Sequence, residues 1–198
     1  MTSAEGGLVD ENTRRERIAE ATELAEAIVN GTEPIPDFQT LKNCVKWLKA
    51  GLNFGLGRKL LGRCRDRYDA GQKVWVIQQF ALCTYKDEDR LPDIRFGEAL
   101  KLLESVGLRN PDGVDPRKVP AVTLPETLAL GGAVYKRMWE QSGQLENLHE
   151  SFALYRSAWK RDPETDAGYG GVNAAFVLDI LAARLRTIAR RSGTGEDL

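Results

Sequence analysis

An all-α fold built from repeated helical hairpins, with eight to nine helices, is the structure that this sequence predicts. The first observation is an internal repeat, because residues 80–86 align with residues 130–136 at an offset of 50. The second is that apolar residues recur at steps of three and four along most of the chain, which is the spacing of one face of a helix. No segment has the alternating pattern of a strand. Helix pairs that stack on their neighbours as a solenoid are therefore expected.

The second helices of the two repeated units also correspond, at an offset of 52. Each carries a small residue, a large apolar residue four positions later and a proline after the helix. These positions are Ala99, Leu103, Val106 and Pro111 in one unit, and Ser151, Tyr155, Ala158 and Pro163 in the other. This order matches the A-x3-F…P half of the tetratricopeptide pattern, in which the small residue lets two helices approach. We therefore expect a tetratricopeptide-like solenoid.

The first expected helix covers residues 13–29 and is ended by Gly31, Pro34 and Pro36. Its apolar face consists of Ile18, Ala21, Leu24, Ala25 and Ile28. A helix pair follows at 37–50 and 54–68, and Asp37 is suited to cap the first of these helices because its side chain can accept from free backbone N–H groups.

The next pair is expected at 72–85 and at 91–106, with Leu91 or Asp93 at the start of the second helix and Gly107 as its stop. Residues 108–122 hold three prolines and predict a long loop. The last helices are expected at 125–142, 145–161 and 169–191.

Three regions follow from this division: a flexible leader at 1–12, one helical domain at 13–191 and a flexible tail at 192–198. The helix at 169–191 has no second helix after it, yet its apolar residues cover much of its circumference. They are Val172, Ala175, Phe176, Leu178, Ile180, Leu181, Leu185 and Ile188. We therefore expect a homodimer through this helix, or coverage by a downstream domain.

The bulk composition excludes several classes of protein. The 198 residues are 42% hydrophobic with a net charge of −1, and no apolar run reaches the roughly 20 residues of a membrane span. The N-terminus does not resemble a signal peptide, so a cytoplasmic protein is expected. Three isolated cysteines, Cys44, Cys64 and Cys83, predict buried thiols, and no metal or cofactor is expected.

Three motifs resemble a known regulatory region. They are W-x-x-Q-Q-x-A-L-x-x-Y-K at 75–86, P-E-T-L-x-x-x-G-A-V-Y-K-R-x-W at 125–139 and Y-x-G-V-N-A-A at 169–175. Together they are similar to the TRAFs-binding domain, the tetratricopeptide-like region of apoptosis-signal-regulating kinases (mitogen-activated kinase kinase kinases) and of bacterial homologues. The resemblance covers about 41–185 and departs from the family at Leu124 and Gly170. It implies a scaffold that binds adaptors or controls activation, because this chain has no kinase motifs.

Equivalent Tyr-Lys positions in the two repeats are the candidate partner-binding site, since equivalent positions of a solenoid line one surface. The candidates are Gln79, Tyr85, Lys86, Tyr135, Lys136, Arg137 and Asn173. They could recognise a peptide carboxylate, an acidic side chain or a phosphate. In the alternative interpretation the tyrosines pack in the core, the lysines are solvated and Asn173 bridges helices.

A basic stretch offers a second candidate surface. Its cations are Lys42, Lys46, Lys49, Arg58, Lys59 and Arg63, followed by Arg65 and Arg67. Such a face could bind RNA or an acidic partner, or it could complement the predominantly acidic segment 1–39 within the fold. No aromatic ladder accompanies the cations, so nucleic acid is not the expected partner.

Catalysis has little support in the sequence. His149 is the single histidine and stands without a nucleophile motif or metal-ligand spacing nearby. We therefore predict a non-enzymatic protein-interaction module, an adaptor or regulatory scaffold in a signalling or stress/defence context. The alternatives are a nucleic-acid-binding protein that uses the basic stretch, or an enzyme whose active site the sequence does not reveal.

Overall fold

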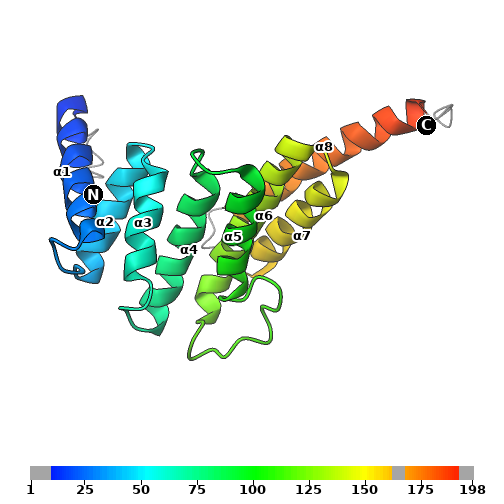
Figure 1. The fold of residues 1–198 in the computed structure, drawn as a ribbon. Helices are drawn as coiled ribbons and strands as arrows, with labels where there is room; N and C mark the ends of the chain where they lie inside the picture. Colours follow the sequence, from blue (N-terminus) through cyan, green and yellow to red (C-terminus); the bar gives the residue numbers. More distant parts are fainter. Residues whose placement is uncertain (1–9, 162–167, 192–198) are drawn as a thin grey trace, which may run out of the picture.

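A computed structural model describes residues 10–161 and 168–191, which form a row of helices in chain order (Figure 1). The helices are α1 (Glu11–Asn30), α2 (Phe38–Ala50), α3 (Phe54–Cys64), α4 (Ala70–Lys86), α5 (Pro92–Glu104), the 3-10 turn η1 (Ala121–Thr123), α6 (Leu124–Ser142), α7 (Leu145–Arg161) and α8 (Tyr169–Arg191). No strand occurs within this part of the chain. The prediction of an all-α helical-repeat solenoid is confirmed. The expected leader and tail lie almost wholly outside the described residues, although α1 begins at Glu11 rather than residue 13.

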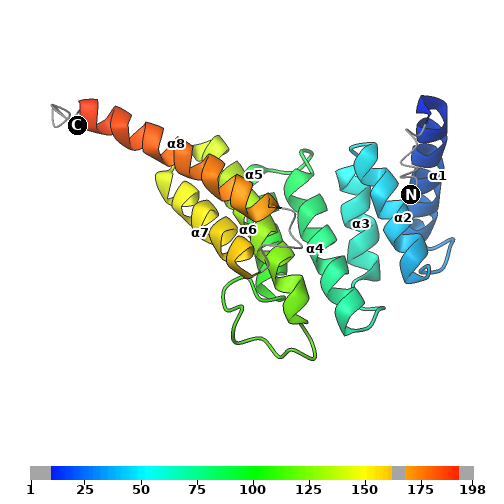
Figure 2. The same ribbon diagram turned by 180° about the vertical axis from the view of Figure 1, so that it is seen from behind.

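Two layers of helices make up the row. Contacts link α2 to α4, α4 to α6 and α6 to α8, so these four helices form one layer, which Figure 2 shows from behind. Helices α3, α5 and α7 pack against the helices of this layer, and α1 packs on both α2 and α3. We call the layer of α2, α4, α6 and α8 the even layer.

The expected close approach of paired helices occurs between α6 and α7. A side chain at Gly132 would place its Cβ 3.0 Å from the ring of Tyr155, and the Ser151 hydroxyl donates a 2.8 Å hydrogen bond to the Gly132 carbonyl. The corresponding positions of the other repeat, Ala99 and Leu103, are fully buried. The small-residue positions of the repeat pattern therefore set the distance between helices.

The predicted helix at 54–68 is wrong at its C-terminal end, because α3 stops at Cys64. Tyr68 instead turns toward α2, where its hydroxyl donates to the Pro36 carbonyl at 2.8 Å and its ring lies 5.5 Å from that of Phe38. The Asp69 side chain caps α4 by accepting from the Gln72 N–H at 3.1 Å. This cap starts α4 at Ala70, two residues earlier than expected.

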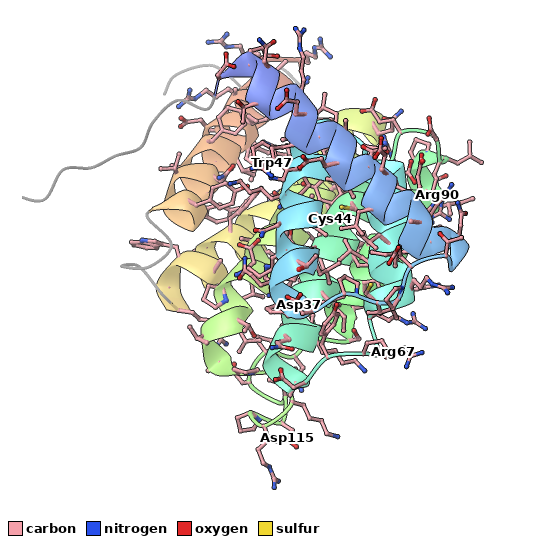
Figure 3. All side chains as sticks on the ribbon, turned by 90° about the vertical axis from the view of Figure 1, so that its left-hand side faces the viewer. Asp37, Cys44, Trp47, Arg67, Arg90 and Asp115 are labelled. Atoms are coloured by element: carbon pink, nitrogen blue, oxygen red, sulfur yellow. The ribbon has the colours of Figure 1, made fainter. Side chains whose placement is uncertain are left out.

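Two main core clusters fill the row. One packs α1, α2, α3 and part of α4, and the other packs α4 to α8. Figure 3 looks along the row from the α1 end, with Cys44 beneath α1 and Asp115 on the long loop that projects from the helices. All three cysteines are buried free thiols, as expected, and burial raises the pKa of Cys44 and Cys64 to about 11.

Candidate functional site

Cations from three helices of the even layer lie close enough to influence one another. Lys49 is on α2, Lys86 is the last residue of α4 and Arg137 is on α6. The Lys49 ammonium donates a 2.7 Å hydrogen bond to Gln79 Oε1, which ties α2 to α4. The candidate Gln79 is buried and is engaged by this bond.

The Lys86 ammonium stands in an environment that disfavours its charge. Its Nζ lies 5.2 Å from the ring centroid of Phe54 on α3. Burial, and then the neighbouring Arg137 and Lys49, lower the pKa of Lys86 below its usual value. No ion pair to Lys86 occurs among the residues that the structure describes. A group that brings negative charge to Lys86 would relieve this electrostatic cost.

A surface pocket of about 550 Å³ opens beside Lys86. Its wall takes in the start of α3, the end of α4, the α4–α5 turn, α5 and the second half of α6. The residues that matter most for its chemistry are Phe54, Tyr85, Lys86, Asp87, Arg95 and Arg137. We call this the edge pocket.

Two of the edge-pocket charges are neutralised within the fold. Asp87 is 3% exposed and accepts from Arg58 Nε at 2.7 Å, and Arg137 pairs with Glu140. Lys86 and Arg95 are the cations without an ion pair among the described residues. The buried Nε of Arg95 also has no hydrogen-bond partner there. The edge pocket therefore offers two cations and an unsatisfied donor.

The rim of the edge pocket is acidic on one side, where Glu88 and Asp89 are exposed in the α4–α5 turn. A ligand that fits this pocket would present an acidic group to Lys86 and Arg95, and it would keep that group away from the turn.

The tyrosines of the repeated Tyr-Lys positions are core residues. Tyr85 and Tyr135 are each 7% exposed. Burial is the main cause that raises the pKa of Tyr85. The Tyr135 hydroxyl accepts a 2.8 Å hydrogen bond from Arg109 Nη2. In both repeats the tyrosine ring packs in the core, as the alternative interpretation of these positions expects.

The two lysines are not brought together. Lys86 lies by Phe54, whereas the Lys136 ammonium lies 5.0 Å from the ring centroid of Phe176 on α8. It is Arg137, the residue after Lys136, that shares the edge pocket with Lys86. Asn173 is half-buried, and its side-chain amide donates to the Tyr169 carbonyl of the same helix at 2.9 Å.

The basic stretch is divided between α2 and α3. Lys49 and Arg58 are engaged with Gln79 and Asp87, while the other six cations are exposed: Lys42, Lys46, Lys59, Arg63, Arg65 and Arg67. Within the described residues, the ion pairs of α1 stay inside α1 and none reaches the basic stretch. Charge complementarity between α1 and these cations is therefore not supported by ion pairs.

Sequence reasoning missed Arg95 and Phe54, because they come from helices that only the fold brings to α4 and α6. Among the described residues no cluster of three or more His, Cys, Asp or Glu side chains could hold a metal ion, and His149 is exposed. Nor does that part of the chain contain a helix with the length and hydropathy of a membrane span.

The sequence model of the family described as Tetratricopeptide Repeats-Sensor matches residues 53–178, which is more than half of the chain. The chain belongs to the Tetratricopeptide Repeats-Sensor family. Comparisons with curated proteins and with solved structures gave no significant match. The Tetratricopeptide Repeats-Sensor match spans α3 to the middle of α8, so it includes every residue of the edge pocket except Leu52. Tetratricopeptide-type repeats are in general protein-interaction modules, and this coarse role applies to the chain.

Proposed function

We propose that this protein is a non-enzymatic adaptor or regulatory scaffold that binds an acidic segment of a partner protein at the edge pocket and along the even layer. The observation that carries the proposal is the lining of the edge pocket, where Lys86 and Arg95 have no ion pair among the described residues and the buried Arg95 Nε has no hydrogen-bond partner there. A carboxylate or phosphate of the partner would form charge-assisted hydrogen bonds with Lys86 and Arg95.

The part of the even layer that lies beyond the edge pocket is consistent with an extended peptide as the ligand. Exposed aromatic and apolar side chains on α8, namely Tyr169, Val172 and Phe176, add apolar contact area beside Lys136. Apolar contacts beside cations suit a segment that alternates acidic and apolar residues. The resemblance to the regulatory region of apoptosis-signal-regulating kinases further suggests a signalling role, and we propose a cytoplasmic location for it.

Quantitative pull-down followed by mass spectrometry tests this proposal. The bait is the full chain, and the double variant Lys86→Glu with Arg137→Glu is compared with Lys160→Glu, which reverses an exposed cation on α7 outside the edge pocket. We expect the double variant to lose its specific partner proteins by at least about tenfold, because reversed charge would repel an acidic segment. Lys160→Glu should retain them.

Far-UV circular dichroism and urea midpoints of the three proteins verify that each is folded. Equal loss of partners in the double variant and in Lys160→Glu would refute binding at the edge pocket, and so would equal retention. Recovery of RNA in place of proteins, with binding that weakens steeply as salt is added, would favour the basic stretch instead.

A further inference from the structure

The two ends of the helical row have different surfaces. At the α1 end the outward side chains are polar, and exposed acids line the helix at Glu16, Glu20, Glu23 and Glu26. At the other end α8 exposes large apolar side chains: Leu178 is 50% exposed and Leu185 is 52% exposed. A polar outer face closes a solenoid, whereas an apolar face requires a further layer. The α8 end is therefore the open one.

The apolar residues on α8 follow the spacing of a coiled coil. Ala174, Leu178, Leu181, Leu185 and Ile188 are separated by alternating steps of four and three residues. Ala174 and Leu181 are buried in the core cluster that joins α4 to α8. The seam then continues along the C-terminal half of α8, which extends beyond α7 (Figures 1 and 2). We call Leu178, Leu185 and Ile188 with their flanking charges the α8 seam.

Charge distinguishes the candidates that could cover the α8 seam. Four arginines accompany it, namely Arg184, Arg186, Arg190 and Arg191, against one acid, Asp179. None of them takes part in an ion pair among the described residues, and Arg184 lies 5.8 Å from the ring centroid of Trp139. The apolar residues of the α8 seam are therefore flanked mainly by basic side chains.

A second copy of the protein would complement these basic side chains poorly. An α8–α8 contact would bring two sets of the same arginines together, and like charges across an interface are unfavourable. The outer face of α1 in another copy has the opposite charge, but its exposed positions are mostly polar and offer no matching apolar seam. A helix with apolar residues at the same spacing and acids beside them would match both the apolar residues and the flanking arginines of the α8 seam.

We propose that the α8 seam docks an acidic amphipathic helix of a partner protein, which adds the next layer to the solenoid. This surface is separate from the edge pocket, because no residue of α8 lines that pocket. The α8 seam and the edge pocket would then engage two different elements, one helical and one extended.

Fluorescence anisotropy with designed peptides tests the proposal on the full chain. One labelled peptide has Leu and Ile at the seam positions of three heptads and Glu beside them, and its matched control has Lys in place of each Glu. The Glu peptide should bind at least about tenfold more tightly than the Lys peptide, and added salt should reduce this difference.

Variants locate the contact. Leu185→Glu should abolish binding of the Glu peptide, because it places a carboxylate in the seam beside the acids of the peptide. Val122→Glu changes a 75% exposed apolar residue of η1 and should leave binding unchanged. The double variant Lys86→Glu with Arg137→Glu should also bind the Glu peptide normally, which separates this test from that of the edge pocket.

Four results would overturn the proposal. Absence of binding by the Glu peptide, or equal binding of both peptides, would refute the acidic helix. Concentration-dependent self-association in sedimentation equilibrium that Leu185→Glu removes would assign the seam to a second copy. Binding to vesicles of anionic lipid that Leu185→Glu removes, without binding of the Glu peptide, would assign it to a membrane surface.

Discussion

Replacing Gly132 with alanine tests the contact that holds α6 against α7. The added Cβ would lie 3.0 Å from two ring carbons of Tyr155 and 3.1 Å from a third. Tyr155 is 1% exposed, and its ring also packs on that of Tyr169 at 6.2 Å between centroids. The ring therefore has little room to move, and the substitution overpacks the interface.

Two opposing effects set the magnitude. Overpacking of a well-packed core costs about 1–3 kcal/mol, while alanine is favoured over glycine inside a helix by up to about 1 kcal/mol. We expect Gly132→Ala to lower the free energy of unfolding by about 1–2 kcal/mol, which for a chain of this length corresponds to a fall in Tm of about 2–8 °C.

Gly97→Ala is the matched control. Gly97 lies inside α5, and a Cβ added there would meet nothing within 4 Å. Only the helix-propensity effect operates at this position, so Gly97→Ala should raise the free energy of unfolding by about 0.5–1 kcal/mol.

Urea unfolding followed by circular dichroism at 222 nm measures both variants, with thermal unfolding as a second readout. Gly132→Ala should unfold at lower urea than the wild-type protein, and Gly97→Ala at equal or higher urea. A Gly132→Ala protein as stable as the Gly97→Ala protein would show that the space between α6 and α7 can accept a Cβ at Gly132. The explanation that close helix packing requires a small residue at this position would then be refuted.

Three further predictions concern buried polar groups. Because burial raises the pKa of the thiols, to about 11 for Cys44 and Cys64 and about 12 for Cys83, a thiol reagent at pH 8 should label them slowly in the folded protein and rapidly in urea. The stability that these neutral thiols contribute is fully present below their unfolded pKa near 8.5 and should be lost as the pH rises toward 11, which urea midpoints at several pH values would detect. Asp87→Ala leaves Arg58 without its 2.7 Å partner and should cost about 2–3 kcal/mol, since charged hydrogen bonds at buried sites are strong. Asp66→Ala, which breaks exposed pairs with Lys73 and Arg65, should leave the urea midpoint almost unchanged, and equal effects of the two substitutions would contradict a special role for the buried pair.

Local patterns in the sequence were sufficient for the helices, for the solenoid and for the close approach of two helices at Ser151. Helix faces follow a fixed period, and a repeat places small residues where two helices meet, so both can be read from spacing alone. Asp37 illustrates the same point, because its side chain accepts from the Gln39 and Thr40 N–H groups as an N-cap should. The end of α3 could not be read in this way, since the bond from Tyr68 to Pro36 joins residues 32 positions apart.

The repeat also located the cations but not their surroundings. It paired Lys86 with Lys136, while the fold sets Lys86 beside Arg137, Arg95 and the ring of Phe54. These neighbours come from α3, α5 and α6, and no local period relates them. The sequence by itself determined which helices form and which of their faces are apolar, because both depend on interactions within a few residues. Only the tertiary structure decided which charges form ion pairs and which have none among the described residues, because that depends on distances between helices remote in the chain.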